Sequence, residues 1–287
     1  MQLVTGILCL SKVKLSYFPS TKIQLVAVNC LQPKRNLEQS WIIRCLSSFL
    51  LFGQILLHFL RGKTYYRKIL EHMVTAGPAS ISPVLLVNGF AGMIFTIQTA
   101  RELVRFGAVD SVGGAFALAF CRELAPILTA SIIAGQVGSA FAAELGAMRV
   151  TEQIDALYML RTDPIDYLVL PRVIACCLMM PVMMIFAVVT GIIGGAFAAA
   201  QFYQVVPETF LESVRAFLLP SDIFIILLKG LIFGAIVSVN GCNWGLTTQG
   251  GAKEVGESAT TAVVTTWVAI FIMDFILAVL LFEKPIL

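Results

Sequence analysis

Four ionisable residues lie inside long apolar stretches of the sequence: Arg122, Glu123, Lys229 and Asp274. A charged group in apolar surroundings is costly, so it usually faces a protein interior or a wet cavity. Two kinds of chemistry are open to such groups. They can form ion pairs that hold helices together, or they can gate the movement of a proton or a polar headgroup.

A second polar group lies in "ELGAMRVTEQIDAL", residues 144–157, between two long apolar stretches. In this segment Ala147, Val150, Ile154 and Leu157 recur at steps of three and four residues, so a helix would carry them on one face. We therefore predict an amphipathic helix over about 144–160. It is either a surface helix resting on headgroups or a protein-docking element, and its mixed charges argue against simple binding to anionic lipid. Its polar residues are Glu144, Arg149, Glu152, Gln153 and Asp155.

The sequence gives little support for enzyme chemistry. It contains no Ser-His-Asp arrangement or zinc-binding spacing, and the seven cysteines, which show no CxxC spacing, are expected to be buried free thiols. Its two histidines, His58 and His72, suggest no metal site, and no cofactor is implied. The segment "GAKEVGES", residues 251–258, has the glycine spacing of a phosphate-binding loop, but Glu257 stands where that loop requires lysine. We expect a flexible cytoplasmic turn there, and no ATP hydrolysis by this chain.

The elements that must position these residues are membrane spans. Of the 287 residues, 58% are hydrophobic and 13% are charged, whereas soluble domains carry about 25% charge. A helix needs about 20 apolar residues to cross a bilayer, and five segments satisfy this requirement. We predict an all-α polytopic integral membrane protein with spans at about 81–100, 112–143, 173–203, 223–239 and 262–282.

The orientation follows from the basic residues near the N-terminus. Five of them precede the first acidic residue, Glu38, which favours a cytoplasmic N-terminus. The net charge of +3 is too small to indicate a nucleic-acid surface. Five spans then put 144–172 and 241–261 inside, and 204–222 and the C-terminus outside. The basic residues are Lys12, Lys14, Lys22, Lys34 and Arg35.

The segment 41–61 is ambiguous. Polar residues form one stripe along it, and the remaining faces carry Leu, Ile and Phe, a pattern that favours an amphipathic helix lying in the membrane interface. The alternative is a sixth span, which would place every downstream loop on the opposite side of the membrane. The extension 1–37 has no clear role: it makes a poor signal peptide and weakly resembles an organellar transit segment. The stripe consists of Arg44, Ser47, Gln54, His58 and Arg61.

The span boundaries place two of the ionisable residues at matching depths. Lys229 lies about 10 Å from the outer surface if the fourth span enters near Asp222, and Asp274 lies about 12 Å from it if the fifth span leaves near Phe282. We therefore predict an intramembrane polar network built on a Lys229–Asp274 ion pair and extended by Arg122 and Glu123.

The stretch "RELAPILTASIIAGQVGSAFAAELGAMRVTEQIDALYMLRTDPIDYLVLPRV", residues 122–173, resembles the signature region of the MlaE permeases. These are the membrane subunits of lipid-transporting ABC systems that work with MCE-domain proteins. The resemblance extends over about 38–282 and includes "GGAKEVGESATTAVV". It implies that 144–157 forms the coupling helix that docks into the ATPase subunit. The sequence departs from the family at Gln136, where Arg is common, and in the extension 1–37.

The resemblance implies a permease domain over 38–287 that acts as a homodimer with a separate cytoplasmic ABC ATPase and an MCE-domain substrate-binding protein. A phospholipid or related lipid would be carried in a cavity between protomers, in a bacterial inner membrane or a plastid inner envelope. The alternatives are an ion-coupled secondary transporter, in which Asp274 or Glu123 carries a proton, and a scaffold that transports nothing. The spacing of Gly191 and Gly195 favours close helix packing, either within the chain or between two copies of it. Four methionines could line a cavity for lipid acyl chains or face the bilayer. These methionines are Met179, Met180, Met183 and Met184.

Overall fold

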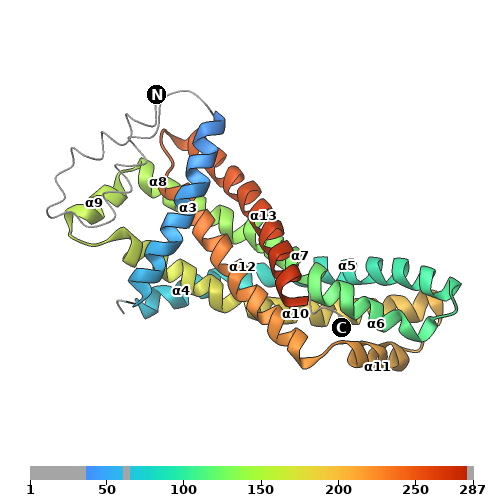
Figure 1. Cartoon of the computed structure of the whole chain (residues 1–287). Helices are drawn as coiled ribbons and strands as arrows, with labels where there is room; N and C mark the ends of the chain where they lie inside the picture. The colour runs from blue at the N-terminus through green and yellow to red at the C-terminus, as the bar shows by residue number, and fades with distance from the viewer. Residues whose placement is uncertain (1–36, 61–64, 283–287) are drawn as a thin grey trace.

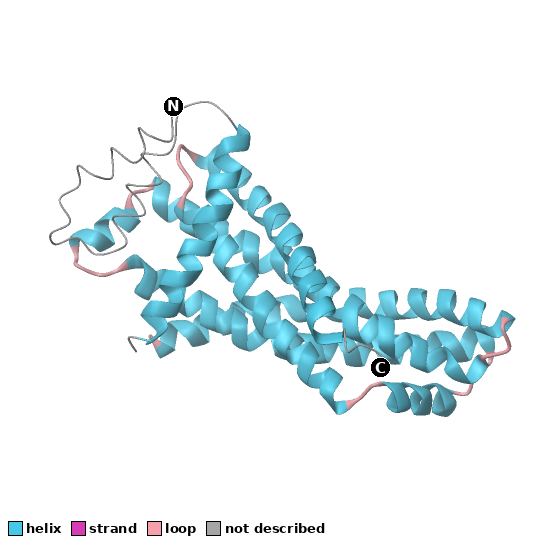
Figure 2. Ribbon diagram, viewed as in Figure 1, coloured by secondary structure: helices cyan, strands magenta, loops and turns pink. Residues whose placement is uncertain are grey.

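The computed structural model describes residues 37–60 and 65–282, and over these residues the regular elements are helices (Figures 1 and 2). The expected extension 1–37 therefore lies almost wholly outside the described residues. The principal helices are α3 (Leu37–Leu60), α4 (Tyr66–Ala76), α5 (Pro78–Arg105), α10 (Leu170–Tyr203), α11 (Pro207–Phe217), α12 (Pro220–Leu246) and α13 (Ala252–Phe282).

The second span is a composite helix in which α-helical and π-helical turns alternate. A short 3-10 turn, η1 (Val109–Ser111), leads into it, and α9 (Gln153–Met159) and the π-helical η4 (Ile165–Val169) connect it to α10. Its parts are α6 (Val112–Phe116), η2 (Ala117–Leu124), α7 (Ala125–Ile133), η3 (Ala134–Gly138) and α8 (Ser139–Val150).

The predicted all-α polytopic architecture is confirmed. Among the described residues, five helical segments are long and apolar enough to cross a membrane. They are longer than the predicted spans, because helices continue past the apolar core into polar residues. The segments are Tyr66–Arg105, Val112–Val150, Ile165–Tyr203, Pro220–Leu246 and Ala252–Leu281.

The packing of α5 on α10 depends on glycine. A Cβ at Gly92 would collide with the backbone of Gly191, and one at Gly195 would lie 2.7 Å from Thr96 Oγ1. Small residues let two helix backbones approach each other closely. Gly191 and Gly195 therefore allow close packing within the chain, which was one of the two interpretations of their spacing.

The methionines of α10 also pack inside the protomer. Met180, Met183 and Met184 are buried in the main core, where they contact neither lipid nor solvent. The expectations that they line a lipid cavity or face the bilayer are wrong for these three residues. Spacing alone could not decide this, because α10 has neighbours on several sides, including α4, α5 and α12.

Helix α3 crosses the bundle steeply, at the end of the molecule where α8 and α9 lie (Figure 1). The described residues of its polar stripe, from Arg44 to His58, face protein, and Arg61 lies outside the described residues. Asn243 of α12 donates hydrogen bonds to Arg44 O and Ser48 Oγ, both at 2.9 Å, and accepts one from Ser47 Oγ at 3.0 Å. The exposed surface of α3 is apolar and includes Leu46, Phe49 and Leu57. An interfacial position for α3 stays a prediction, but the direction in which its stripe points is opposite to the one expected.

Candidate functional site

Lys229 lies at the centre of a charged cluster that joins three spans. Its side chain is fully buried, and its Nζ lies 2.7 Å from Glu123 Oε2 and 2.8 Å from Asp274 Oδ1. It also donates a hydrogen bond of 3.1 Å to Arg122 O. Glu123 belongs to η2, Lys229 to α12 and Asp274 to α13. The predicted Lys229–Asp274 pair is therefore present, and Glu123 extends it.

The side chain of Arg122 forms an ion pair with another carboxylate, which the sequence analysis did not predict. Its Nη2 lies 2.7 Å from Asp222 Oδ2, in the first turn of α12. Asp222 is buried and also accepts the Leu219 N–H at 2.9 Å, so one carboxylate both caps α12 and pairs with Arg122. The sequence interpretation treated Asp222 only as the end of a loop. An acidic residue at the start of an apolar helix was the available signal.

Arg122 and Glu123 are adjacent in sequence but pair with different residues, Asp222 and Lys229, both on α12. Arg122 and Glu123 both lie in η2, and π-helical turns are rare and are frequently found at functional sites. A second π-helical segment, η3, carries Gln136, whose side chain is exposed.

The cluster contains one ammonium group and two carboxylates, so its formal charge is −1 when all three are ionised. In the low dielectric of a protein interior such groups must be paired, because removing one partner leaves an uncompensated buried charge. The arrangement can lock η2, α12 and α13 together. Its extra carboxylate can also accept a proton without loss of the lysine pair.

The segment 144–160 does not form the single helix predicted for it. Helix α8 ends at Val150, where Thr151 Oγ1 donates a hydrogen bond back to Ala147 O at 2.8 Å. Glu152 then takes a left-handed conformation with φ of 59°, and α9 starts in a new direction. The apolar residues before and after Glu152 therefore do not share one helical face, although Ile154 is still buried in the core.

Four of the five polar residues of this segment lie at the corner between α8 and α9. Arg149 Nη1 lies 2.8 Å from Asp155 Oδ1, and 57% of the Asp155 side chain is exposed. Glu152 and Gln153 are also exposed. We refer to Arg149, Glu152, Gln153 and Asp155 as the α8–α9 corner.

Glu144 lies apart from the α8–α9 corner. It is on α8, and its Oε2 lies 2.9 Å from Nη2 of Arg172, a buried residue in the first turn of α10. Arg172 also donates to Leu168 O at 2.9 Å. Glu144 thus contributes to the contact between two spans. From the sequence, Arg172 was only the last residue of the loop 144–172, because its partner lies 28 positions away along the chain.

The segment "GAKEVGES" is not a flexible turn over its whole length. Helix α13 begins at Ala252, and Glu254 Oε2 accepts the Gly251 N–H at 2.8 Å, which caps the helix. The Gly251 N–H, which a phosphate-binding loop would use to hold a phosphate, is therefore bonded to Glu254. Glu257 is exposed on α13 and lies 3.7 Å from Lys253.

Comparison with known proteins identifies the family. The model of the family described as "Permease MlaE" matches residues 69–280. This chain belongs to the MlaE permease family. The matched region contains both the Lys229 cluster and the α8–α9 corner, so both are parts of the MlaE permease domain of an integral membrane protein.

Relatives with similar sequences occur in bacteria and plastids. A probable ABC transporter permease protein of Synechocystis is 54% identical over 85% of this chain and 92% of its own length. The chloroplastic protein TRIGALACTOSYLDIACYLGLYCEROL 1 of Arabidopsis thaliana is 46% identical over 85% of this chain and 69% of its own. A probable ABC transporter permease protein of Rickettsia prowazekii is 36% identical over 85% of this chain and 93% of its own.

Proposed function

We propose that this MlaE permease is the membrane-spanning subunit of an ABC transporter that moves a phospholipid or a related lipid between membranes. The observation that carries the proposal is the 54% identity to the Synechocystis permease over 92% of that protein's length. The lipid substrate is supported by the Arabidopsis relative, which bears the name of a glycolipid. The membrane would be a bacterial inner membrane or a plastid inner envelope.

A separate cytoplasmic ATPase subunit would supply the energy and dock at the α8–α9 corner. The corner combines exposed charges with two exposed apolar side chains, Met159 and Leu160, at the end of α9. Charged and apolar groups side by side suit a protein partner better than a headgroup layer. ATP would be hydrolysed by that partner and not by this chain.

The remaining partners would be a second copy of the chain and an MCE-domain protein. Helix α11 lies at the end of the molecule opposite α9 (Figure 1). A binding protein on the far side of the membrane would therefore contact α11 and the loops beside it. The lipid would occupy a cavity between the two protomers.

Purification in mild detergent tests this function. An ABC permease should bring down a nucleotide-binding subunit whose ATP hydrolysis responds to lipid, and mass spectrometry of the extract should identify a bound lipid. Glu152→Lys should reduce recovery of that subunit, whereas Glu212→Lys, the same change on exposed α11, should not. Transport that depends on an ion gradient, without any ATPase, would instead support the ion-coupled alternative based on Asp274 or Glu123.

The proposed orientation has its own test. In a cysteine-accessibility scan, Thr151→Cys and Glu254→Cys should react from the cytoplasmic side and Glu208→Cys from the opposite side. A reaction of Thr151→Cys from outside would mean that α3 crosses the membrane. Glu283, which should also react from outside, lies beyond the described residues.

A further inference from the structure

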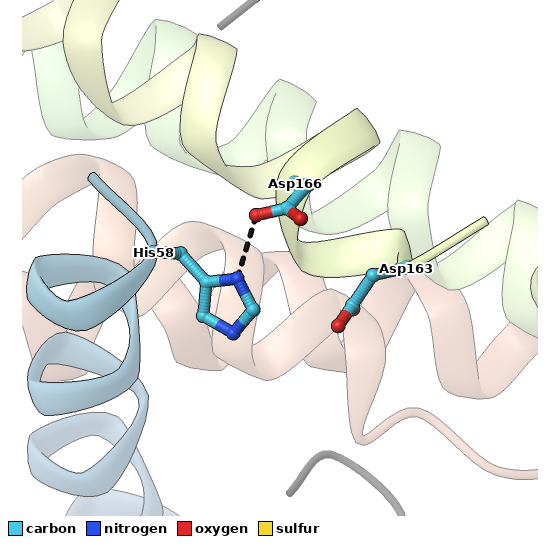
Figure 3. A group of neighbouring side chains, drawn as sticks. All are labelled: His58, Asp163 and Asp166. Atoms are coloured by element: carbon cyan, nitrogen blue, oxygen red, sulfur yellow. Dashed lines mark hydrogen bonds and ion pairs between the residues drawn. The ribbon is translucent and has the colours of Figure 1, made fainter. Parts of the chain in front are cut away.

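Three potential metal ligands meet where the end of α3 contacts the loop before α10. His58 Nδ1 lies 2.6 Å from Asp166 Oδ1, and Asp163 stands beside them (Figure 3). One ligand atom from each of the three residues can be chosen so that all lie within 4.8 Å of one another. The helix and the loop are 108 residues apart in sequence at the His58–Asp166 contact, so no spacing motif indicates this group.

The histidine in this group is buried: only 6% of His58 is exposed. Nδ1 contacts Asp166, and Nε2 has no hydrogen-bond partner among the residues that the structure describes. A buried imidazole ordinarily uses both ring nitrogens, either in hydrogen bonds or as metal ligands. The carboxylates of Asp163 and Asp166 are partly buried as well.

Asp163 also has a structural role at this position. Its Oδ1 accepts the Ile165 N–H at 3.1 Å, at the start of η4. A carboxylate has two oxygens with about four lone-pair sites, so Asp163 can coordinate an ion beside this bond and its other contacts. Asparagine can make the same bond to the helix start but is a much weaker ligand for a cation.

We propose that His58, Asp163 and Asp166 bind a divalent transition-metal ion of the zinc class. Zinc sites with an open position commonly use three protein ligands from imidazole and carboxylate groups, with water as the fourth. Tetrahedral coordination with metal–ligand bonds of about 2.0–2.2 Å places ligand atoms roughly 3.3–3.6 Å apart, so the widest pair, now within 4.8 Å, needs to close by up to about 1.5 Å. A nitrogen ligand favours zinc over magnesium, which takes oxygen ligands.

The bound ion joins two parts of the chain that otherwise meet through few contacts. It ties the end of α3 to η4, and thereby to the start of α10. Its binding therefore strengthens the attachment of α3 to the rest of the permease.

Calorimetry with zinc alone tests the proposal on the full chain, purified in detergent and first treated with a chelator. About one zinc ion per chain is expected to bind at this site. Asp163→Asn should weaken that binding at least tenfold while preserving the start of η4, and His58→Gln should abolish it. His72→Gln is the matched control, because His72 is the other histidine and packs on Phe141. Its zinc affinity should equal that of the unchanged protein.

Zinc should also raise the thermal unfolding midpoint of the unchanged protein and of His72→Gln, but not that of Asp163→Asn. Magnesium should do neither. The proposal is overturned if the unchanged protein and Asp163→Asn bind zinc equally. It is also overturned if zinc shifts neither midpoint. If His58→Gln does not fold, the comparison of Asp163→Asn with His72→Gln decides alone.

Discussion

The Lys229 cluster and the α8–α9 corner contain ion pairs of nearly equal length in opposite surroundings. Lys229 lies 2.8 Å from Asp274 with side chains 0% and 7% exposed, and Arg149 lies 2.8 Å from Asp155 with side chains 19% and 57% exposed. When the Arg149–Asp155 pair breaks, water solvates both charges. When the Lys229–Asp274 pair breaks, its buried charges have no water to replace the lost contact. Exposed pairs contribute about 0.2–1 kcal/mol, whereas removing one partner of a buried pair costs about 3–5 kcal/mol.

The difference assigns the two regions different tasks. The buried cluster holds the second, fourth and fifth spans together, because separating Lys229 from Asp274 would leave two buried charges unpaired. The exposed corner contributes little to folding, so its charges are available to another protein. The distance between the charged atoms therefore does not by itself show how much an ion pair contributes to stability.

The largest expected effect comes from Lys229→Met. It leaves Glu123 and Asp274 facing each other without a counter-ion, so the free energy of unfolding should fall by about 3–5 kcal/mol. Unfolding in detergent measures this. Asp274→Asn should cost less, because Glu123 still pairs with Lys229 at 2.7 Å.

The double variant Lys229→Met with Asp274→Leu sharpens this result. It removes the repulsion between Glu123 and Asp274, so it should recover part of the stability lost in Lys229→Met, while Glu123, whose side chain is 32% exposed, still lacks its partner. If the change in unfolding free energy of the double variant equals the sum of those of Lys229→Met and Asp274→Leu measured singly, the residues do not interact. Recovery of stability without recovery of lipid transport would place the pair in the transport mechanism.

Asp222→Ala should have the second largest effect. It removes the partner of Arg122 and the acceptor of the Leu219 N–H together, which should lower the free energy of unfolding by about 2–3 kcal/mol. Asp222→Asn keeps the cap and loses only the charge, so its cost should be roughly half as large. Equal unfolding free energies for both variants would show that the cap contributes nothing.

Arg149→Gln breaks the pair at the exposed corner. The free energy of unfolding should change by less than about 1 kcal/mol, because water replaces the lost contact. Recovery of the ATPase subunit should nevertheless fall, since the corner is its proposed docking site. A large loss of stability with undiminished recovery would reverse the comparison between the two regions.

Lys253→Ala should cause the smallest change in the free energy of unfolding among these variants. Lys253 and Glu257 lie 3.7 Å apart with side chains 83% and 67% exposed. Such i,i+4 pairs contribute about 0.3–0.5 kcal/mol, so the unfolding free energy should change by no more than that. A measured loss above 1 kcal/mol would mean that exposure is a poor guide to ion-pair strength in this protein.

Much of this architecture was predictable from sequence because it depends on local composition. The spans follow from the length of apolar segments against the thickness of a bilayer, and the pairing of Lys229 with Asp274 follows from their equal depths. The helix ends were less predictable, since α13 begins at Ala252, inside a polar and glycine-containing segment. The ATPase-docking role of the α8–α9 corner stays a prediction from the family resemblance.

The sequence by itself determined that this is a membrane protein with five segments long and apolar enough to span, because hydrophobic length is a property of each segment alone. Only the tertiary structure decided which polar groups meet: Arg122 with Asp222, Glu144 with Arg172, and the α3 stripe with Asn243. These partners lie on different helices, so their meeting depends on how each helix rotates and tilts against its neighbours. That choice is made by close contacts such as Gly92 on Gly191, which no single segment contains.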